Sequence, residues 1–388
     1  MRILFVVGRP PYPPLRGDQV RAWHQLRMLS RTHAVEVLAL DREDPVAARA
    51  LAGRGVRVGW SPSPLAGRAL RVVRHAASGL PLQAALFDLD AHRRALGEAL
   101  SRGADVVHVQ LVRLAPLLPA SGRVPCVVDL VDALSQNIAR RAERDRGPTR
   151  ALWRMEARRL RALEADVIAR AGHSVVVSDA DRDALGGGPR LSTVPNGVDG
   201  ARFAFDGAVR ANADIAFTGN LGYFANADAA AWFAREAFPL VRARRPEARF
   251  LIAGARPSRA VRALGRLPGV TVLGPVEDMA AVIRAARVAV APLQSGSGQQ
   301  SKILEAMACG TPVVASPLAL AGIAAQDGRD LRVGADADGT AAAVLELLED
   351  DALAARLARA GRRLVDELYT WERSAALLEA AYERAVLA

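Results

Sequence analysis

Lysine is almost absent from this sequence of 388 residues: Lys302 is the only lysine among 52 basic residues, and the others are arginines. No apolar run approaches the roughly 20 residues of a membrane-spanning helix. The apolar part of the opening, "MRILFVVGRPPYPP", is too short for a secretory signal. The two cysteines, Cys126 and Cys309, lie far apart in apolar segments and are typical of reduced core residues. We therefore expect a cytoplasmic protein.

Patterns for several classes of site are also missing. No cluster of His and Cys has the spacing of a metal site, and acidic triplets as short as those at 88–90 and 179–181 arise by chance. The basic stretch 140–164 contains one aromatic residue, Trp153, so it lacks the stacking residues of a nucleic-acid surface. The loop "GSGQQS" falls short of GxGxxG. The sequence therefore predicts no metal, no nicotinamide cofactor and no nucleic-acid partner.

Positive charge is concentrated in the first half of the chain. Residues 1–205 carry 31 Arg against 20 acidic residues, whereas residues 206–388 carry 21 basic and 21 acidic residues. The whole formal net charge of +11 thus lies in the first half. One interpretation is a surface that attracts an acidic partner or an anionic membrane. The other is a solvated basic helix face in a protein whose composition favours arginine generally.

The segment around Lys302 has the pattern of an anion site. Gly296 and Gly298 permit a close backbone approach to a ligand, Ser301 is a candidate N-cap, and a helical apolar stripe follows until Gly310. A glycine-rich loop that opens a helix with a cation in its first turn suits a phosphate. The alternative is a surface turn with an ordinary exposed lysine.

Strands and helices alternate along the whole chain, which predicts an α/β protein of two doubly wound, Rossmann-like domains. We place the first domain at 1–205 and the second at 206–370. The predicted strands are 2–7, 34–40, 56–60, 105–110, 124–132, 173–179 and 191–199 in the first half, and 215–221, 248–255, 270–276, 288–293 and 311–316 in the second. Helices are expected at about 227–245, 257–266, 278–286 and 301–309.

Ligands of open parallel sheets bind at the carboxyl ends of the strands. Two such domains facing one another would place a central cleft between these ends. Loops 9–19, 220–228 and 294–301 are then the candidates for chemistry.

The chain resembles the GT4 family of retaining, nucleotide-sugar-dependent glycosyltransferases with the GT-B fold. The resemblance covers nearly the whole chain. It is strongest in "FTGNLGYFANADAAAWF", "IAGARP", "GVTVLGPVEDMAAVIRAARVAVAPL" and "GSGQQSKILEAMACGTPVVAS", with "VVSDADRDAL", "VPNGVD" and "YPPLRGDQVRAWHQLRMLSRTHAVEV" in the first half. It implies that the C-terminal segment 371–388 crosses back onto the first domain.

The resemblance also implies roles for single residues. Lys302 would contact the donor diphosphate, and Glu305 would accept hydrogen bonds from the donor ribose. The backbone of Gly17 would approach the phosphate, and that of Val276 would lie near the nucleobase. The other residues assigned to donor binding by their positions are Asn220, Ser297, Gly298 and Gln299.

The chain departs from the family pattern at several of these positions. Ser297 stands where many members have a glutamate, and Asn220 and Asn226 stand where many have basic residues. Many members carry a histidine where this chain has Val131, beside Asp132. These departures leave Lys302 as the only obvious cation at the diphosphate.

On the acceptor side, Asp132 and His108 each lie at the end of a predicted strand of the first domain and are candidates for orienting the acceptor. The alternative for His108 is a core histidine, and that for Asp132 is an N-cap. Asp18 is interpreted as a structural N-cap.

The sequence therefore predicts a retaining glycosyltransferase that uses a UDP, GDP or dTDP sugar without a bound metal. The acceptor would be a glycan, a lipid-linked sugar or a small natural product, and the protein would be cytoplasmic with a peripheral contact to the inner membrane surface if the acceptor is lipid-linked. The alternatives are a non-catalytic nucleotide-sugar-binding partner subunit and a GT-B-fold nucleotide-sugar epimerase.

Overall fold

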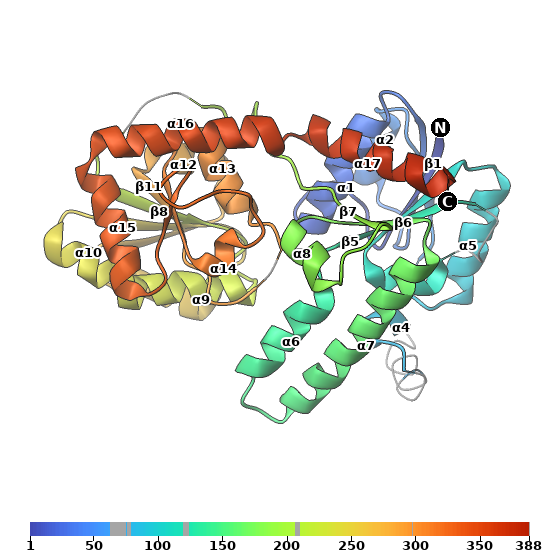
Figure 1. Ribbon diagram of the computed structural model, residues 1–388, viewed down its shortest axis with the longest axis horizontal. Coiled ribbons are helices and arrows are strands. Elements are labelled where there is room, and N and C mark those ends of the chain that lie inside the picture. The colour runs from blue at the N-terminus through green and yellow to red at the C-terminus, as the bar shows by residue number, and fades with distance from the viewer. Residues whose placement is uncertain (63–74, 76–78, 119–123, 206–209, 297, 388) are drawn as a thin grey trace. The chain divides into compact units, whose positions relative to one another are not determined.

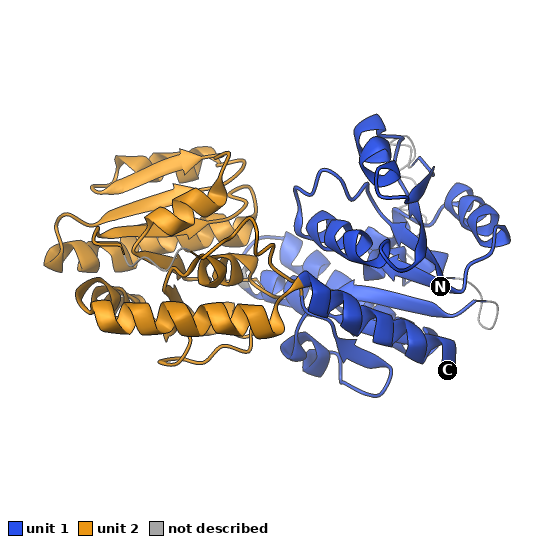
Figure 2. Ribbon diagram, turned by 90° about the horizontal axis from the view of Figure 1, so that it is seen from above, with its two compact units in different colours: residues 1–195, 371–388 blue, residues 196–370 orange. Residues whose placement is uncertain are grey.

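The chain divides into two units, each built around its own parallel sheet (Figure 2). A computed structural model describes residues 1–388 apart from 63–74, 76–78, 119–123, 206–209, 297 and 388. The first unit comprises Met1–Pro195 and Trp371–Ala388, and the second comprises Asn196–Thr370. The change of unit thus lies between Pro195 and Asn196, earlier than the position after residue 205 that we expected from the sequence.

The first unit contains a seven-stranded parallel sheet in the order β3-β2-β1-β4-β5-β6-β7. The order reverses between β1 and β4, which makes the sheet doubly wound. Its strands are β1 (Arg2–Val7), β2 (Ala34–Ala39), β3 (Arg57–Trp60), β4 (Val106–Gln110), β5 (Cys126–Val131), β6 (His173–Val176) and β7 (Leu191–Thr193).

Helices cover both faces of this sheet, which explains the unbroken apolar run in its first strand. Ile3 and Phe5 of β1 pack on one face, whereas Leu4 and Val6 pack in a separate cluster on the other. The helices are α1 (Gly17–Leu29), α2 (Pro45–Ala52), α4 (Leu82–Ala85), α5 (Asp90–Ser101), α6 (Leu134–Arg144), α7 (Thr149–Arg170), α8 (Asp179–Ala184), α17 (Trp371–Leu387) and the 3-10 helix η1 (Val112–Leu117).

Two features of the first unit stand out in Figure 1. Helices α6 and α7 form a hairpin that extends away from the sheet. The C-terminal helix α17 packs against α1 and β6, with Leu378 and Tyr382 completely buried. This confirms the prediction that the C-terminal segment returns to the first domain.

The second unit has a six-stranded parallel sheet in the order β10-β9-β8-β11-β12-β13. Its strands are β8 (Asp214–Thr218), β9 (Arg249–Ala253), β10 (Val270–Gly274), β11 (Val288–Ala291), β12 (Val313–Ala315) and β13 (Arg332–Val333). Its helices are α9 (Phe224–Trp232), α10 (Phe238–Arg244), α11 (Arg259–Ala263), α12 (Met279–Ala285), α13 (Ser301–Cys309), α14 (Pro317–Leu320), α15 (Ala337–Glu349) and α16 (Asp351–Leu368), with a π-helical turn at Phe233–Ala237 and a 3-10 turn at Leu264–Arg266. The predicted helix at 227–245 is therefore α9 and α10 joined through the π-helical turn.

The carboxyl ends of β8 and β9 approach each other so closely that only glycine fits. A Cβ on Gly254 would lie 1.7 Å from the carbonyl oxygen of Gly219. The φ angles of Gly254 and Gly219 are 148° and 152°, positive values that residues other than glycine rarely adopt. This close approach shapes the edge at which the candidate site lies. Among the described residues, none of the helices is long and apolar enough to span a membrane.

Candidate functional site

Helix α13 presents Lys302 in its first turn, as the sequence predicted. The helix begins at Ser301 and ends at Gly310, whose φ of 74° is left-handed. The residue that precedes it, Gln300, is the N-cap, and among the described residues no side chain makes a capping hydrogen bond to the helix. Ser301 is thus the first helical residue rather than the N-cap, so the N-cap assignment was wrong. The first N–H groups of α13 lack a side-chain cap and remain suited to an anion.

The ammonium of Lys302 is held by neutral partners. Its Nζ donates to Oδ1 of Asn226 at 2.8 Å and to Oε1 of Gln300 at 3.4 Å, and it lies 5.4 Å from the centre of the Phe217 ring. An ammonium has three donors, so these two contacts leave one N–H for a ligand. The side chain is partly buried, and this burial lowers the pKa of Lys302 to about 8, although Glu305 acts to raise it. Lys302 is therefore not the ordinary exposed lysine of the alternative interpretation.

Glu305 lies one helical turn beyond Lys302 on α13 and is also partly buried. Burial raises the pKa of Glu305 to about 7, against the opposing effects of Lys302 and Arg202. Near neutral pH this carboxyl group can accept hydrogen bonds from hydroxyl groups, and it becomes a weaker acceptor as it is protonated.

The loop after β8 is fixed by two asparagines that replace the basic residues of the family pattern. Nδ2 of Asn226 donates to the carbonyl oxygen of Asn220 at 3.0 Å, and Oδ1 of Asn220 accepts from the N–H of Gly222 at 3.1 Å. Asn226 thus joins this loop to Lys302 through the two ends of one amide. A Cβ on Gly219 would lie 3.0 Å from Nδ2 of Asn226 and 3.4 Å from Cε of Lys302, so the glycine permits this packing. The Asn220 side chain is used within its own loop.

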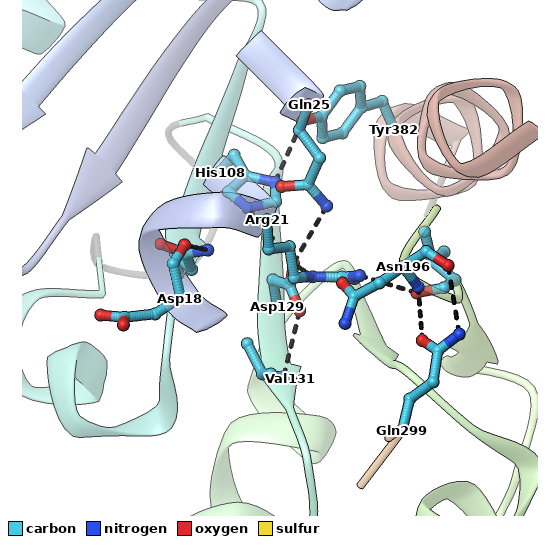
Figure 3. Close-up of polar contacts among 11 residues, drawn as sticks. Asp18, Arg21, Gln25, His108, Asp129, Val131, Asn196, Gln299 and Tyr382 are labelled. Carbon is cyan, nitrogen blue, oxygen red and sulfur yellow. Dashed lines mark hydrogen bonds and ion pairs between the residues drawn. The ribbon is translucent and has the colours of Figure 1, made fainter. Parts of the chain in front are cut away.

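The Gln299 side chain holds the main chain at the start of the second unit. Its Oε1 accepts from the N–H of Asn196 at 2.7 Å, and its Nε2 donates to the carbonyl oxygen of Asn196 at 3.1 Å (Figure 3). Both ends of the amide are therefore occupied by one backbone residue. The sequence placed Gln299 among the donor-binding residues, and in the structure both polar atoms of its side chain bond to the main chain of Asn196.

The remaining donor-side positions lie at the same edge of the second sheet. Gly296 and Gly298 have left-handed φ values of 112° and 71°, as a tight loop before α13 requires. Ser297 lies outside the described residues. Val276 lies in the loop after β10 and is partly buried.

Gly17 is the first residue of α1, directly after β1 and its loop. A Cβ on Gly17 would meet nothing within 4 Å, so its backbone is open to a ligand. Asp18 lies in the first turn of α1, and the N-cap is Arg16, so the assignment of Asp18 as the N-cap was wrong. Its carboxylate instead pairs with Nε of Arg9 at 3.3 Å.

A buried polar network, which sequence reasoning missed, lies beneath this edge of the first sheet (Figure 3). Nε of Arg21 on α1 donates to Oδ2 of Asp129 on β5 at 2.6 Å, and both side chains have no exposed surface. Gln25 also donates to this oxygen at 3.3 Å. Nη1 of Arg21 donates to the carbonyl oxygen of Val194 at 2.9 Å. The signal in the sequence was a carboxylate inside the apolar strand "CVVDLV", because a buried charge needs a partner.

His108 belongs to this network and not to the surface. It is completely buried, stacks on Phe5 with ring centres 3.9 Å apart, and its Nδ1 lies 3.0 Å from the hydroxyl of Tyr382. Burial lowers the pKa of His108 to about 4, with Asp129 acting to raise it and Arg21 to lower it. The imidazole is therefore neutral near pH 7. His108 is therefore a core histidine, which was the alternative interpretation from the sequence, and its buried imidazole is not exposed to an acceptor.

Asp132 lies just beyond β5 on an unusual turn. The preceding residue, Val131, has a φ of 69°, which is a genuine outlier for a β-branched residue. The turn is held by Asp129, whose Oδ1 accepts from the N–H of Val131 at 3.0 Å. Oδ2 of Asp132 accepts from Nδ2 of Asn137 at 2.7 Å. Helix α6 begins after Ala133 and has no side-chain cap, so Asp132 is not the N-cap that its alternative predicted.

Comparisons with known proteins agree with this architecture. Residues 212–350 match the model of a family described as glycosyl transferases group 1. The phosphatidyl-myo-inositol mannosyltransferase of Mycolicibacterium smegmatis is 34% identical over 235 residues, which cover 58% of this chain and 59% of that protein. The MMP alpha-(1->4)-mannosyltransferase of Mycolicibacterium hassiacum is 37% identical over 113 residues, which cover 28% of this chain and 27% of that protein. The chain thus spans less than two thirds of the curated relatives it matches.

Solved structures show the fold over nearly the whole chain. The sucrose-phosphate synthase of Thermosynechococcus elongatus has a TM-score of 0.73 at 16% identity, and the match covers 99% of this chain and 98% of the synthase chain. HepE of Anabaena, solved with UDP and glucose, has a TM-score of 0.68 at 16% identity and covers 99% of both chains. Two parallel α/β sheets with a returning C-terminal helix define the GT-B fold of glycosyltransferases. The residues that match the model of the glycosyl transferases group 1 family, 212–350, lie within the second unit and include the motifs on which the resemblance was based.

Proposed function

We propose that this protein is a retaining glycosyltransferase that moves a sugar from a nucleoside-diphosphate sugar to a hydroxyl or amine acceptor. The observation that carries the proposal is the ammonium of Lys302, held by two neutral amide oxygens in the first turn of an uncapped helix. In the part of the chain that the structure describes, no carboxylate forms a hydrogen bond or ion pair with this Nζ. The Lys302 ammonium and the first N–H groups of α13 are therefore available to bind an anion.

The proposed donor occupies the edge of the second unit formed by the loop after β8, the loop before α13, and α13 itself. Lys302 binds the diphosphate, and Glu305 binds the ribose hydroxyls from the same helix. Gly298 and Val276 contribute backbone groups. Relatives whose names specify mannosyl transfer, and a structural neighbour solved with UDP-glucose, support a nucleotide-sugar donor. The candidate nucleotides are UDP, GDP and dTDP.

The proposed chemistry uses protein groups to stabilise the leaving diphosphate, without a bound metal. The bond between the anomeric carbon and the diphosphate oxygen breaks, and the acceptor oxygen or nitrogen bonds to that carbon on the face that the diphosphate leaves. The acceptor proton passes to a phosphate oxygen of the leaving group. Lys302 and the first N–H groups of α13 are fixed donors that need little rearrangement as charge develops, which is where such donors contribute most. Asp132 is proposed to orient the acceptor.

We further propose an acceptor that bears negative charge, in glycoconjugate or polysaccharide biosynthesis. The hairpin of α6 and α7 supports a negatively charged acceptor, because several arginines are exposed on it and one tryptophan is partly exposed. Arg141 lies over the Trp153 ring with its guanidinium carbon 4.0 Å from the ring centre. The exposed arginines are Arg141, Arg146, Arg150, Arg154, Arg158 and Arg161. Each cation close to an anionic bilayer contributes about 1 kcal/mol, so this surface suits a peripheral contact with the inner membrane surface.

Two measurements test these proposals separately. A thermal-shift panel of UDP, GDP, dTDP and their sugars, followed by transfer and hydrolysis assays with the best ligand, tests the donor and the reaction. Co-sedimentation with vesicles of increasing anionic lipid content, at low and high salt, tests the membrane contact. We expect binding that rises with anionic lipid and falls with salt. Absence of binding at low salt would remove the membrane and leave a water-soluble acceptor.

The second candidate function is a non-catalytic nucleotide-sugar-binding subunit. It is favoured by the serine at position 297, where many family members carry a glutamate. Such a subunit would bind a nucleotide sugar without hydrolysing or transferring it under any acceptor condition. Donor hydrolysis that is abolished by Lys302→Ala would exclude this candidate.

A further inference from the structure

Arg113 lies on an unusual turn at the carboxyl end of β4 in the first unit. The strand ends at Gln110, and the next residue, Leu111, has φ 79° and ψ 132°, a combination that almost only glycine adopts. The 3-10 helix η1 starts immediately afterwards and carries Arg113 as its second residue. This is the same edge of the sheet at which Asp132 follows the neighbouring strand β5.

Arg113 is partly buried, and no described residue forms a hydrogen bond or ion pair with its guanidinium. Its Nε is shielded from solvent and has no hydrogen-bond acceptor among the described residues. The other two guanidinium nitrogens, Nη1 and Nη2, also have no hydrogen bond or ion pair with any described residue. Burial lowers the pKa of Arg113, but an arginine keeps its charge in proteins. A buried donor on a charged group is costly to leave without a partner, so its acceptor is expected to come from outside the described chain.

The charged neighbours of Arg113 already have other contacts. Asp18 and Asp132 act on it electrostatically, as does Arg9 with the opposite effect. Asp18 pairs with Arg9, and its carbonyl oxygen accepts from Nε2 of Gln110 at 3.0 Å. Asp132 accepts from Asn137. Asp18 and Asp132 are therefore held by other residues, and Nε of Arg113 has no hydrogen-bond partner among the described residues.

We propose that Arg113 binds a phosphate group of the acceptor substrate. The proposal rests on the proposed glycosyltransferase function only in naming the ligand as the acceptor. A guanidinium offers paired N–H donors that match two oxygens of one phosphate, and a buried Nε strengthens such a contact. Arg9, engaged with Asp18 beside it, adds a second positive charge to the edge. Asp132 next to it accepts a hydroxyl of the same ligand.

The direct test is a ligand-observed NMR titration with glycerol 3-phosphate at low ionic strength. The protein is the Lys302→Ala variant, so that the donor diphosphate site does not contribute. We expect saturable binding that Arg113→Gln weakens about tenfold or more, the loss expected for one charge-assisted contact. Arg31→Gln is the matched control, because it removes the same charge from an exposed position after the far end of α1; binding is expected to stay within about twofold.

Three results would overturn the proposal. The first is that Arg113→Gln binds glycerol 3-phosphate as tightly as the parent, and the second is that the parent binds glycerol as tightly as glycerol 3-phosphate. The third is that acetate displaces glycerol 3-phosphate as well as inorganic phosphate does, which would indicate a general anion effect. Arg113→Lys is a second variant in case Arg113→Gln unfolds. It keeps the charge and loses the paired donors, and we expect it to bind glycerol 3-phosphate more weakly than the parent and more tightly than Arg113→Gln.

Vesicles distinguish the two sources of the phosphate. The probes are phosphatidylcholine vesicles with and without phosphatidic acid, at low salt. If Arg113→Gln reduces retention on phosphatidic acid vesicles relative to Arg31→Gln, the phosphate is lipid-borne. If retention is equal and only glycerol 3-phosphate binding is weakened, the phosphate belongs to a water-soluble acceptor. If neither measurement changes, Arg113 is not a phosphate ligand. These binding assays stay informative even if no nucleotide sugar is transferred, so failure of the proposed function is distinguishable.

Discussion

Arg21 and Asp129 form an ion pair of 2.6 Å between α1 and β5, and neither side chain has any exposed surface. The same carboxylate holds the N–H of Val131 with its second oxygen, at 3.0 Å. One buried residue thus joins the first helix of the first unit to the turn that carries Asp132. His108 and Tyr382 extend the network to the C-terminal helix.

Breaking this ion pair should destabilise the first unit strongly. Asp129→Asn keeps the shape of the side chain but leaves the Arg21 charge unpaired in the core. We expect the free energy of unfolding to fall by about 3–5 kcal/mol, the usual consequence of removing one partner of a buried pair. Denaturant unfolding monitored by circular dichroism measures it. Tyr382→Phe removes only the outer hydrogen bond and should cost about 1 kcal/mol. Equal losses in the two variants would contradict the central role of Asp129.

Lys302→Ala should leave the fold intact and slow transfer severely. The ammonium is the proposed fixed donor to the diphosphate, and loss of such a contact costs roughly 2–4 kcal/mol at the transition state. Steady-state kinetics with the donor found by thermal shift measures the loss. Lys302→Arg should also be impaired, because a planar guanidinium does not fit between Asn226 and Gln300 as a compact ammonium does. Turnover at the parent rate in Lys302→Ala would remove this residue from the mechanism.

Donor affinity should pass through a maximum between pH 7 and 8. Lys302, with a pKa of about 8 in the free protein, loses its charge as the pH rises, so diphosphate binding weakens above that value. Glu305, with a pKa of about 7, is protonated as the pH falls, so its acceptance of ribose hydrogen bonds weakens below that value. Nucleotide dissociation constants measured across this range test both limbs. Glu305→Gln should abolish the acid limb and leave the alkaline one; an unchanged acid limb would assign it to another group.

Glu305→Ala should raise the donor KM more than it lowers kcat. The proposed ribose contacts are made equally in the ground state and the transition state, so their loss weakens binding without changing the chemical step to the same extent. Initial-rate kinetics over a range of donor concentrations separates the two constants. A collapse of kcat at an unchanged KM would instead place Glu305 at the reacting sugar.

Gln299→Ala should affect stability more than nucleotide binding. The variant loses two hydrogen bonds to the backbone of Asn196, and we expect a loss of about 1–3 kcal/mol in the free energy of unfolding of the second unit. The nucleotide dissociation constant should change less than about threefold, because the side chain is already occupied by the protein. Thermal unfolding and nucleotide titration on the same sample distinguish the two roles. A large rise in the dissociation constant at unchanged stability would restore Gln299 as a donor ligand.

The return of the C-terminal helix was expected only from the family resemblance, whereas patterns in the sequence itself predicted the two parallel sheets and the position of Lys302 at the start of α13. The sheets and the start of α13 depend on local patterns: apolar runs of strand length, helical stripes, and glycines such as Gly310 where a helix must end. Such signals act over a few residues, so they can be read along the chain.

Only the tertiary structure decided what the polar side chains contact. His108 proved to be a core residue because Phe5 and Tyr382 enclose it. Gln299 holds Asn196, which lies far away in the sequence. Arg113 emerged because no described residue offers its guanidinium an acceptor. These outcomes depend on which residues, distant in the sequence, the fold brings within about 3 Å of each other, the range in which a hydrogen bond forms. Neither the composition nor the periodicity of the sequence specifies those distances.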